Sequence, residues 1–573
     1  MRIRQVLDQP LTAALSELIG QPAPAMVRAT TDPQFGDYQA DGVMAQAKKI
    51  GRKPRELALE LTRTAALGEY CEKVEVAGPG FVNLRLSNDF LASRLADLAN
   101  DPRLGVEETA EKRSIVVDFS SPNVAKPLHV GHLRSTILGD AIVRVLRFLG
   151  HRVIGDNHAG DWGTQFGMLI TGFRRWGDSP ALTAHPTDEL ERVYRLANDA
   201  AKEDPRVTEA ARAELAKLQT GDPENLALWK QFVTATRAEV EQIYQRLGVS
   251  FDEWRGESAY HDELAPLVED LLRRGVARVD EGAVLIYFEA GDDAELADKP
   301  FMLRKSDGAF LYATTDLATV AYRVRQHQAD EIVYVVDKRQ SLHFRQLFAA
   351  ARKLGYGQRL VHVGFGTILG ADGRPIKTRE GTAIRLADLL SEAVERARVI
   401  IEEKNPSLDP EERDRVAEMV GIGAVKYADL SQNRTSDYRF DWSKLLAFDG
   451  NTAPYLQYVH ARIRSIFRKM GDVDWRWPNQ ERPVLEHPAE RNLTLTLARY
   501  AEVIYDVPVD YLPHLLTDHL FNLSQTFNVF YRDCPVLNSS GVTRDTRLAL
   551  CRLTARQMRH GLDLMGIQAP EQM

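Results

Sequence analysis

The chain has 573 residues, of which 44% are hydrophobic and 27% are charged, and its formal net charge is −8. This length suffices for about three or four domains with cores of their own, and the composition excludes a chain that is disordered over most of its length. The negative net charge excludes a globally cationic nucleic-acid coat, although it leaves room for a local basic surface.

Cysteines and apolar runs exclude further classes of protein. Only Cys71, Cys534 and Cys551 are present, and their odd number and wide spacing predict neither a disulfide framework nor a zinc site. No apolar run reaches the length of a membrane span or of a signal-peptide core. We therefore expect a cytoplasmic protein without a membrane partner.

The first part of the chain predicts a small α+β unit. Helical patterns cover Leu7–Leu18, Arg55–Thr64 and Asp89–Leu98. Alternating residues on both sides of Gly78-Pro-Gly80 predict a hairpin. The charged stretch Glu107–Lys112 marks the end of this unit.

A second unit begins with a buried-type strand at Ser114–Phe119. A loop and a helix with an apolar stripe follow, Gly150 ends that helix, and Val153-Ile154 starts another strand. Strand, helix and strand in this order form a βαβ unit, which predicts a doubly wound parallel sheet. Further strands of this sheet are expected at Val284–Phe288, Ile332–Val336 and Leu360–Val363.

The rest of the chain is mainly helical. Asp188–Leu247 reads as a charged helical insertion, and the pattern from Lys444 to the end is helical apart from an exposed loop at Asp472–Pro478. The prediction is a multidomain α/β protein with an α+β domain, a Rossmann-like parallel-sheet domain with an insertion, and an all-α domain. Their expected bounds are 1–110, 111–443 with the insertion at about 188–247, and 444–573.

Two histidines stand where the helix after the first parallel strand begins, in the sequence His129-Val-Gly131-His132. The N-terminus of a helix offers free N–H groups to a phosphate, and glycine lets a nucleotide approach the backbone. The imidazoles can donate hydrogen bonds as charge develops at an α-phosphorus, with Lys126 and Arg134 adding positive charge. The alternative is a pair of helix-capping histidines. The position after a buried strand favours the phosphate site.

This motif and its surroundings resemble the arginyl-tRNA synthetases, a family of class I aminoacyl-tRNA synthetases. Similar segments extend over nearly the whole chain, at Phe35–Ala40, Gly78–Phe81, Ser121–Thr136, Asn157–Gly167, Leu311–Leu317 and Tyr455–Ile463. The resemblance implies an arginine–tRNA ligase that forms arginyl-adenylate from L-arginine and ATP and transfers arginine to the 3′ end of tRNA(Arg). AMP and pyrophosphate are the other products, and activation is expected to need bound tRNA.

The resemblance also implies a second class I element, the lysine loop usually written KMSKS. It is expected at Gly370–Gly381, where Lys377 is present and Thr378 stands at the place of the second lysine. In relatives with that departure, a lysine before the histidine motif is thought to substitute, which here is Lys126. Without the histidine motif, the loop would read as an ordinary basic loop tip. The residues expected to bind ATP or screen its phosphates are Lys126, Pro127, His129, Gly131, His132, Lys377 and Arg379.

Free arginine carries a planar guanidinium with five donors, so its pocket needs carboxylates. Tyr312 and Asp316 are four residues apart on what should be one helical face. Taken singly, an acid would read as a solvated surface charge and Tyr312 as a packing residue. The resemblance places six residues around the amino acid: Asp118, Asn123, Glu257, Tyr312, Asp316 and Gln340.

For the tRNA, the resemblance points to aromatic residues on helices of the last domain and to the hairpin of the first. Aromatic residues at helical spacing are usually core residues, so packing is the alternative. The arginines of the last helix, at 544, 547, 552, 556 and 559, are candidates for phosphate contacts. The residues expected to contact tRNA are Phe81, Asn83, Tyr455, Tyr458, Phe527, Tyr531 and Met573.

Two other functions stay open at this point. The first is a histidine-motif adenylyl transferase that acts on a small acid without tRNA, which would not need the first and last domains. The second is a catalytically silent paralogue that binds tRNA, against which the intact motif argues. We expect a monomer with tRNA(Arg), L-arginine and ATP as partners, with Mg²⁺ accompanying ATP, with no protein metal-ligand cluster, and with no DNA partner.

Overall fold

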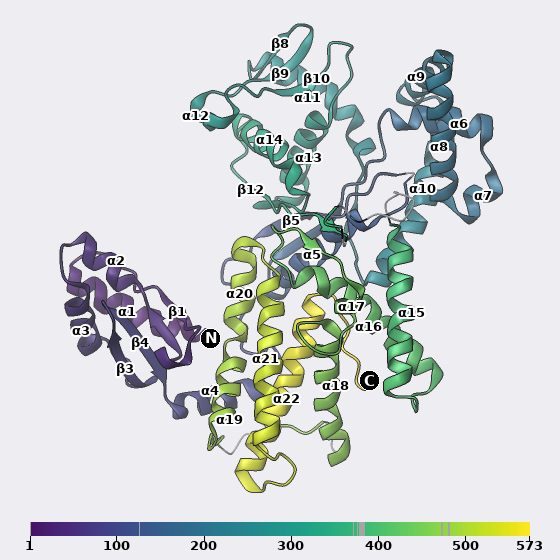
Figure 1. Ribbon diagram of the computed structural model, residues 1–573. Helices are drawn as coiled ribbons and strands as arrows, with labels where there is room; N and C mark the ends of the chain where they lie inside the picture. The colour runs from purple at the N-terminus through teal and green to yellow at the C-terminus, as the bar shows by residue number, and fades with distance from the viewer. Residues whose placement is uncertain are drawn as a thin grey trace. The chain divides into compact units, whose positions relative to one another are not determined.

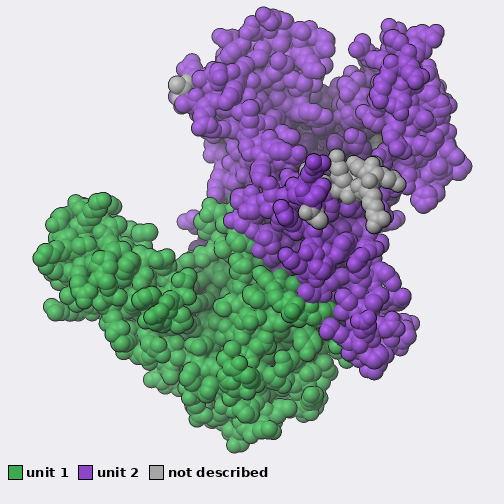
Figure 2. Space-filling view, in the orientation of Figure 1, with its two compact units in different colours: residues 1–108, 448–563, 568–573 green, residues 109–447, 564–567 purple. Residues whose placement is uncertain are grey.

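A computed structural model of the protein describes residues 2–124, 126–370, 372–374, 376, 384–471, 474–478 and 482–573. The chain divides into two compact units, each described by itself below (Figure 2). Unit 1 contains residues 1–108, 448–563 and 568–573, and unit 2 contains residues 109–447 and 564–567. Within the described parts of the chain, no helix is long and apolar enough to cross a membrane.

Unit 1 combines an α+β region from the start of the chain with helices from its end (Figure 1). Its antiparallel sheet has the strand order β1-β2-β4-β3, and the expected hairpin is formed by the last two strands around Gly78-Pro-Gly80. The elements of the first region are α1 (Ile3–Ile19), β1 (Val27–Ala29), η1 (Pro33–Phe35), β2 (Tyr38–Ala40), α2 (Gly42–Lys49), α3 (Pro54–Thr64), β3 (Cys71–Ala77), β4 (Phe81–Leu86) and α4 (Asn88–Asn100).

The helical part of unit 1 packs α21 against α18, α19 and α20. The described part of the expected exposed loop, residues 474–478, has no helix or strand and is mostly exposed, but Trp477 is buried against Ala99 and Ala549. The large apolar ring of Trp477 explains why this one residue is buried while Asp474 and Arg476 beside it stay exposed. The helices are α18 (Ala453–Met470), α19 (Pro488–Ala498), α20 (Tyr500–Asp510), α21 (His514–Asp533) and α22 (Gly541–Leu564).

Unit 2 is built on a five-stranded parallel sheet of order β12-β11-β5-β6-β7. β5 lies in the middle, and its apolar residues are buried on both faces, as the sequence predicts for such a strand. The strands are β5 (Ser114–Asp118), β6 (Arg152–Asn157), β7 (Glu253–Trp254), β11 (Glu331–Tyr334) and β12 (Arg359–His362).

The expected strand at Val284–Phe288 is present, but its assignment to the parallel sheet is wrong. It is β9 (Ala283–Ile286), which pairs antiparallel with β8 (Ala277–Asp280) and β10 (Phe301–Arg304) in a separate sheet. A short apolar run shows that a strand is buried but not which strand it pairs with. A further pair joins β13 (Ile368–Leu369) to β14 (Tyr438–Arg439).

Helices surround the parallel sheet and form the insertion between β6 and β7. Buried residues line α5, and Gly150 after it has a φ of 91°, a conformation that glycine adopts without strain. Helices α6 and α7, which precede the expected insertion at about 188–247, also lie between β6 and β7. The helices are α5 (Val130–Phe148), α6 (Gln165–Trp176), α7 (Ser179–Ala184), α8 (Pro186–Glu203), α9 (Pro205–Gln219), α10 (Pro223–Leu247), η2 (Glu257–Tyr260), α11 (His261–Arg273), α12 (Ala290–Asp293), η3 (Ala294–Leu296), α13 (Tyr312–His327), η4 (Lys338–Gln340), α14 (Ser341–Lys353), α15 (Leu386–Lys404), α16 (Pro410–Leu430) and α17 (Trp442–Leu445).

Candidate active site

The two motif histidines cap the N-terminus of α5. His129 Nδ1 accepts the backbone N–H of Gly131 at 3.0 Å, and His132 Nδ1 accepts the backbone N–H of His129 at 3.1 Å. The ring centroids are 4.0 Å apart. Because both Nδ1 atoms accept, a neutral imidazole carries its proton on Nε2. The capping bonds therefore use only the Nδ1 atoms and hold both Nε2–H groups at the helix N-terminus. The histidines can cap the helix and still donate to a ligand.

Burial and neighbouring groups favour the neutral form of both imidazoles. Burial, together with the nearby Lys126 ammonium, lowers the pKa of His129. Burial and the neighbouring His129 lower the pKa of His132 to about 3. Gly131 fits because a Cβ there would lie 2.7 Å from His129 Cε1. Two neutral donors at a positive helix end suit a phosphate that gains negative charge.

The residues that follow the lysine segment, the loop expected at Gly370–Gly381, lie beside the histidine motif. His129 forms an antiparallel bridge with Arg385. The backbone N–H of Val130 donates to Ile384 at 3.0 Å, and that of Leu386 donates to Leu128 at 2.8 Å. Lys377, Thr378 and Arg379 themselves lie outside the described residues. The described chain resumes at Ile384, and residues 384–386 lie beside the histidine motif.

The backbone turns sharply where β5 ends. Ser120 and Ser121 have φ values of 72° and 47°, which non-glycine residues rarely adopt. The Ser120 hydroxyl bonds to Thr136 at 2.8 Å and to the Tyr244 hydroxyl at 2.7 Å. The Ser121 N–H donates to Asn157 at 3.1 Å. Strain of this kind persists only where surrounding contacts hold it, as it often does at functional sites.

Asp118, at the end of β5, belongs to a buried ion cluster. Arg323 from α13 is fully buried and donates to Asp118 Oδ2 and to Asp156 Oδ2, each at 2.6 Å. The second Asp118 oxygen accepts the Ser121 hydroxyl at 2.8 Å. Burial raises the pKa of Asp156, which Arg323 opposes. Asp118 is therefore already neutralised by a guanidinium of the chain itself.

Asn123 follows on the same loop and is exposed. It forms a parallel bridge with Gly160, where a Cβ would come within 2.4 Å of Asn123 Oδ1. Glycine at this position therefore allows the close approach. Lys126 is exposed and lies 5.8 Å from the centre of the Tyr194 ring. Pro127 is half-buried between Lys126 and the histidines.

A second group of acidic side chains gathers at the N-terminus of α13. Tyr312 is 64% exposed, and Asp316 follows one turn later, with Asp316 Oδ2 accepting from His343 Nε2 of α14 at 2.6 Å. Burial and the charges of Asp316 and Asp161 raise the pKa of Glu257 to about 8. Burial and the charges of Glu257 and Asp316 also raise the pKa of Tyr312. These groups share one electrostatic environment, to which a cation would be attracted.

Gln340 is exposed at the end of η4, three residues before His343. Among the described residues its side chain has no hydrogen-bond partner. The segment that bonds Asp316 therefore also presents a free amide.

Arg134 does not supply the phosphate charge that the sequence suggests. It is 1% exposed, its Nε lies 3.0 Å from Asp429 Oδ2, and its Nη1 donates to Ser436 O at 3.1 Å. It lies one turn into α5, on a helix most of whose residues are buried, and this places it in the core. This prediction is wrong.

The residues expected to contact tRNA differ in how accessible they are. Asn83 is 7% exposed and accepts a hydrogen bond from Gln39 at 2.6 Å, whereas Phe81 is half-buried at the start of β4. Phe527 is fully buried, stacked 5.8 Å from the Tyr531 ring. The structure thus gives Phe527 a packing position, and only Tyr531 of this pair is partly accessible.

The remaining expected tRNA contacts lie on α18 and at the end of the chain. Tyr458 is 44% exposed, and the Tyr455 hydroxyl accepts from Gln525 at 2.8 Å and from Asn528 at 2.7 Å. Met573 is half-buried at the end of a tail that bonds to α18, for example through Pro570 O and His460.

Several arginines of α22 serve packing within unit 1. Arg552 and Arg556 donate to Ala99 O at 2.9 and 3.1 Å, at the C-terminus of α4. Arg547 pairs with the buried Glu490 at 2.7 Å. Cations at a helix C-terminus satisfy its free carbonyls. These three are engaged inside the unit, whereas Arg559 is exposed.

Sequence reasoning missed the residues that hold the site together. They are Ser120, Ser121, Tyr244, Arg323 and His343. No local pattern identifies them, because most of their contacts join elements distant in sequence, as Ser120 with Tyr244 and Arg323 with Asp118 do. Asp156 in an apolar strand was a usable signal that a buried cation must exist elsewhere.

Comparisons with known proteins agree with this geometry. Family models match along the chain: the arginyl tRNA synthetase N terminal domain at 2–86, the catalytic domain of tRNA synthetases class I (R) at 95–442, and the DALR anticodon binding domain at 456–573. Curated arginine–tRNA ligases of Laribacter hongkongensis and Hahella chejuensis are 45% and 44% identical, each covering 100% of both chains.

Solved structures give the same result. Thermus thermophilus arginyl-tRNA synthetase is 27% identical, with a TM-score of 0.84 and 100% of both chains covered. The Plasmodium falciparum arginyl-tRNA synthetase is also 27% identical, with a TM-score of 0.83 over 100% of this chain and 99% of that one. The predicted fold class and family are confirmed. The chain belongs to the arginyl-tRNA synthetase family, class I ligases that use ATP to charge tRNA with arginine.

Proposed function

We propose that His129 and His132 stabilise the α-phosphate of ATP while the arginine carboxylate attacks it. In this step a carboxylate oxygen bonds to the α-phosphorus, the bond to the β-phosphate oxygen breaks, and pyrophosphate leaves. The observation that carries the proposal is the pair of Nδ1 acceptor bonds, which leave both Nε2–H groups as donors. Donors held in place before the reaction stabilise developing charge without reorganisation.

The lysine segment is proposed to complete this phosphate site. Lys377 and Arg379 would meet the leaving pyrophosphate together with Lys126 and Pro127, and Gly131 would leave room for the nucleotide. Support comes from the hydrogen bonds between residues 384–386 and 128–130, because they return the chain to the histidines just after the segment. Phosphoryl chemistry depends mainly on positioning and charge neutralisation, so several cations can share this role.

For arginine, the proposed guanidinium site is Tyr312, Asp316, Glu257 and Gln340. A guanidinium is best held by carboxylates that accept forked hydrogen bonds. Asp316 lies close enough to Glu257 to raise its pKa, and both acids raise the pKa of Tyr312. Asp118 and Asn123, at the end of β5, are proposed for the α-amino and carboxylate side. For Asp118 this means a further hydrogen bond beside those from Arg323 and Ser121.

The second half of the reaction transfers arginine to tRNA. A ribose hydroxyl of the terminal adenosine attacks the arginyl carbonyl carbon, the bond to the phosphate oxygen breaks, and AMP leaves. The tRNA contacts we propose are Phe81, Asn83, Tyr455, Tyr458, Phe527, Tyr531 and Met573. Phe527 would act through Tyr531, against which it stacks, and the amide of Asn83 would need to leave Gln39.

Magnesium is proposed to arrive with ATP. Within the described residues there is no group of three or more histidine, cysteine or acidic side chains that could hold a metal ion. The residues present therefore do not fit a resident metal site, and no step above is routed through one. We further propose that the protein is a cytoplasmic monomer without DNA or membrane partners and that activation of arginine needs bound tRNA. The proposed domain bounds are 1–110, 111–443 and 444–573.

The test replaces each histidine by asparagine, which can keep the capping acceptor near the Nδ1 position but has no group at Nε2. We expect His132→Asn and His129→Asn to lower the rate of tRNA-dependent ATP–pyrophosphate exchange about 10²- to 10³-fold, as loss of one oxyanion donor does. Thermal stability and tRNA affinity should change little.

His487 provides the matched control. It caps α19 through an Nδ1 bond to Ala489 at 3.2 Å, which is the same capping geometry without a proposed catalytic role. His487→Asn should leave exchange unchanged. If the three variants behave alike, the motif histidines only cap their helix and the proposal fails.

A further inference from the structure

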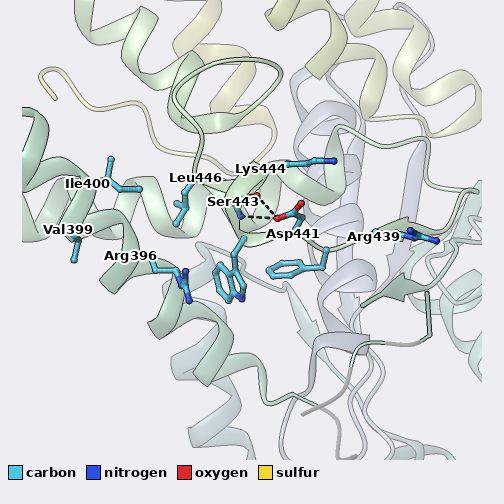
Figure 3. Close-up of a pocket in the computed structure, with 10 residues that line it drawn as sticks. Arg396, Val399, Ile400, Arg439, Asp441, Ser443, Lys444 and Leu446 are labelled. Carbon is cyan, nitrogen blue, oxygen red and sulfur yellow. Dashed lines mark hydrogen bonds between the residues drawn. The ribbon is translucent and has the colours of Figure 1, made fainter. Parts of the chain in front are cut away.

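A groove between α15 and α17 of unit 2 has a volume of about 970 Å³ (Figure 3). Its apolar lining includes Val399 on α15 and Phe440 and Trp442 at the start of α17. Val399 is 49% exposed, which is unusual for an apolar side chain of this size. The proposed ATP, arginine and tRNA contacts include none of these residues.

Aromatic and cationic groups alternate in this groove. The Arg396 guanidinium lies 4.9 Å from the centre of the Trp442 ring, and Phe440 meets Trp442 edge to face at 5.0 Å. Arg439 and Lys444 line the same cavity, as Figure 3 shows. Grooves that bind single-stranded or flexible RNA combine such features, with cations for phosphates and ring faces for bases.

The charges of the groove do not cancel. Its lining contains three cations and one carboxylate, Asp441. That carboxylate is engaged as the N-cap of α17, where it accepts from the N–H of Ser443 at 3.0 Å and from its hydroxyl at 2.7 Å. Arg396 is paired with Glu392, but within the described chain neither Arg439 nor Lys444 forms an ion pair. Two cations that are not held in an ion pair therefore line the groove, although the charge of Lys444 also contributes to lowering the pKa of Asp441.

The groove is also one strand away from the lysine segment. β14, which carries Arg439, pairs with β13, the strand that leads into that segment. The backbone N–H of Phe440 donates to Leu369 at 2.8 Å, and a Cβ on Gly373 would lie 3.5 Å from Arg439 Nη2. A ligand in the groove would thus contact β14, the strand that pairs with β13.

We propose that this groove binds the substrate tRNA, with backbone phosphates on Arg439 and Lys444 and a base or ribose against Trp442. The excess of positive charge favours a polyanion over a protein segment, and the rings favour RNA over a simple anion. This surface goes beyond the proposed tRNA contacts, all of which lie in unit 1. It rests on the family reaction only because that reaction makes tRNA a substrate.

The test measures the dissociation constant of a tRNA(Arg) transcript against salt concentration for Arg439→Ala/Lys444→Ala. Loss of two phosphate contacts should weaken binding about tenfold at physiological salt and reduce the slope of log K against log salt by about 1.4 to 1.8. The Michaelis constant for tRNA should rise in parallel. The maximal rate of exchange at saturating tRNA should stay near wild type.

Two further variants keep the test specific. Arg398→Ala/Arg415→Ala removes the same charge from α15 and α16 at residues that do not line the groove, and it should leave affinity and slope unchanged. Trp442→Leu should weaken binding without changing the salt slope, and Trp442→Phe should retain most of the affinity.

Three outcomes overturn the inference. They are an unchanged affinity and slope in the Arg439/Lys444 variant, equal losses in the Arg398/Arg415 control, or a loss confined to ATP affinity. The last would mean that the cations serve the lysine segment and not RNA. Failure of the proposed catalytic roles is read separately, from the exchange rate of His132→Asn, which does not depend on this groove.

Discussion

Helix α13 connects two groups of acidic side chains that the protein treats in opposite ways. Near its C-terminal end, Arg323 inserts between Asp118 and Asp156 and neutralises both. At its N-terminal end, Asp316 and Glu257 have no arginine of the chain among the described residues, only the His343 imidazole on Asp316. The negative charge of the first group is balanced by an arginine of the chain, whereas the negative charge of the second group is not. In the proposed arginine site, the substrate would therefore supply the cation that the chain does not.

The largest expected effect on stability follows from removing the arginine that neutralises Asp118 and Asp156. Arg323→Ala would leave two buried carboxylates without a cation, which costs about 3 to 5 kcal/mol when one partner of a buried pair is removed. We expect a loss of this size in urea or thermal unfolding of the variant.

Asp316→Asn is the counterpart at the other end of the helix and should cost at most about 1 kcal/mol of stability, as expected for a part-exposed group. If both variants are equally unstable, the distinction between a structural and a ligand-binding group of acids is wrong.

Asp316→Asn should instead act on substrate binding. Loss of a charged hydrogen-bond partner, worth about 1.5 to 3 kcal/mol, predicts a Michaelis constant for arginine about ten- to a hundredfold higher. The Michaelis constants for ATP and tRNA should not change. An equal rise for all three substrates would point to a distorted fold, and no rise for arginine would remove Asp316 from the guanidinium site.

How far the sequence predicts this site depends on how local the contacts are. The histidine motif could be located because the strand, the loop and the helix around it are consecutive in sequence. Its place in the sequence therefore predicts that it lies at the N-terminus of a helix. Arg134 and Phe527 were assigned to ligands, but both are buried, because a helical position does not show which face meets the core. Val284 was assigned to the wrong sheet for a different reason, because a short apolar run does not show which strand it pairs with. Arg323 and His343 were missed because their partners lie in distant elements.

Protonation of Glu257 should make arginine binding depend on pH. Burial and the charges of Asp316 and Asp161 raise its pKa to about 8, so in the empty pocket it is protonated below that pH. A guanidinium favours the carboxylate, so binding below pH 8 must release a proton. Affinity should therefore rise as pH increases from 6.5 to 8, by up to about tenfold per unit, and level off above.

Calorimetry in buffers of different ionisation enthalpy measures that proton directly, with bound tRNA present. Glu257→Gln should abolish the proton release and flatten the pH profile. A profile that is unchanged in Glu257→Gln would assign the titration to another group and separate Glu257 from the arginine site.

The smallest effect on substrate binding should come from substitution of His343. It tests whether the two acidic groups of α13 differ in the way described above. Its Nε2–H fixes one oxygen of Asp316 at 2.6 Å, so the other oxygen is oriented for a ligand. Because Asp316 keeps its charge when the imidazole is removed, His343→Ala should raise the Michaelis constant for arginine only by the worth of one hydrogen bond, about three- to tenfold. His343→Gln can place an N–H near the same position and should recover most of this loss. If the imidazole served as the cation that completes the group, as Arg323 does for Asp118 and Asp156, His343→Gln would not rescue and stability would fall as it does in Arg323→Ala. Rescue by glutamine at normal stability would establish that this acidic group is oriented by the chain but left for the substrate to neutralise.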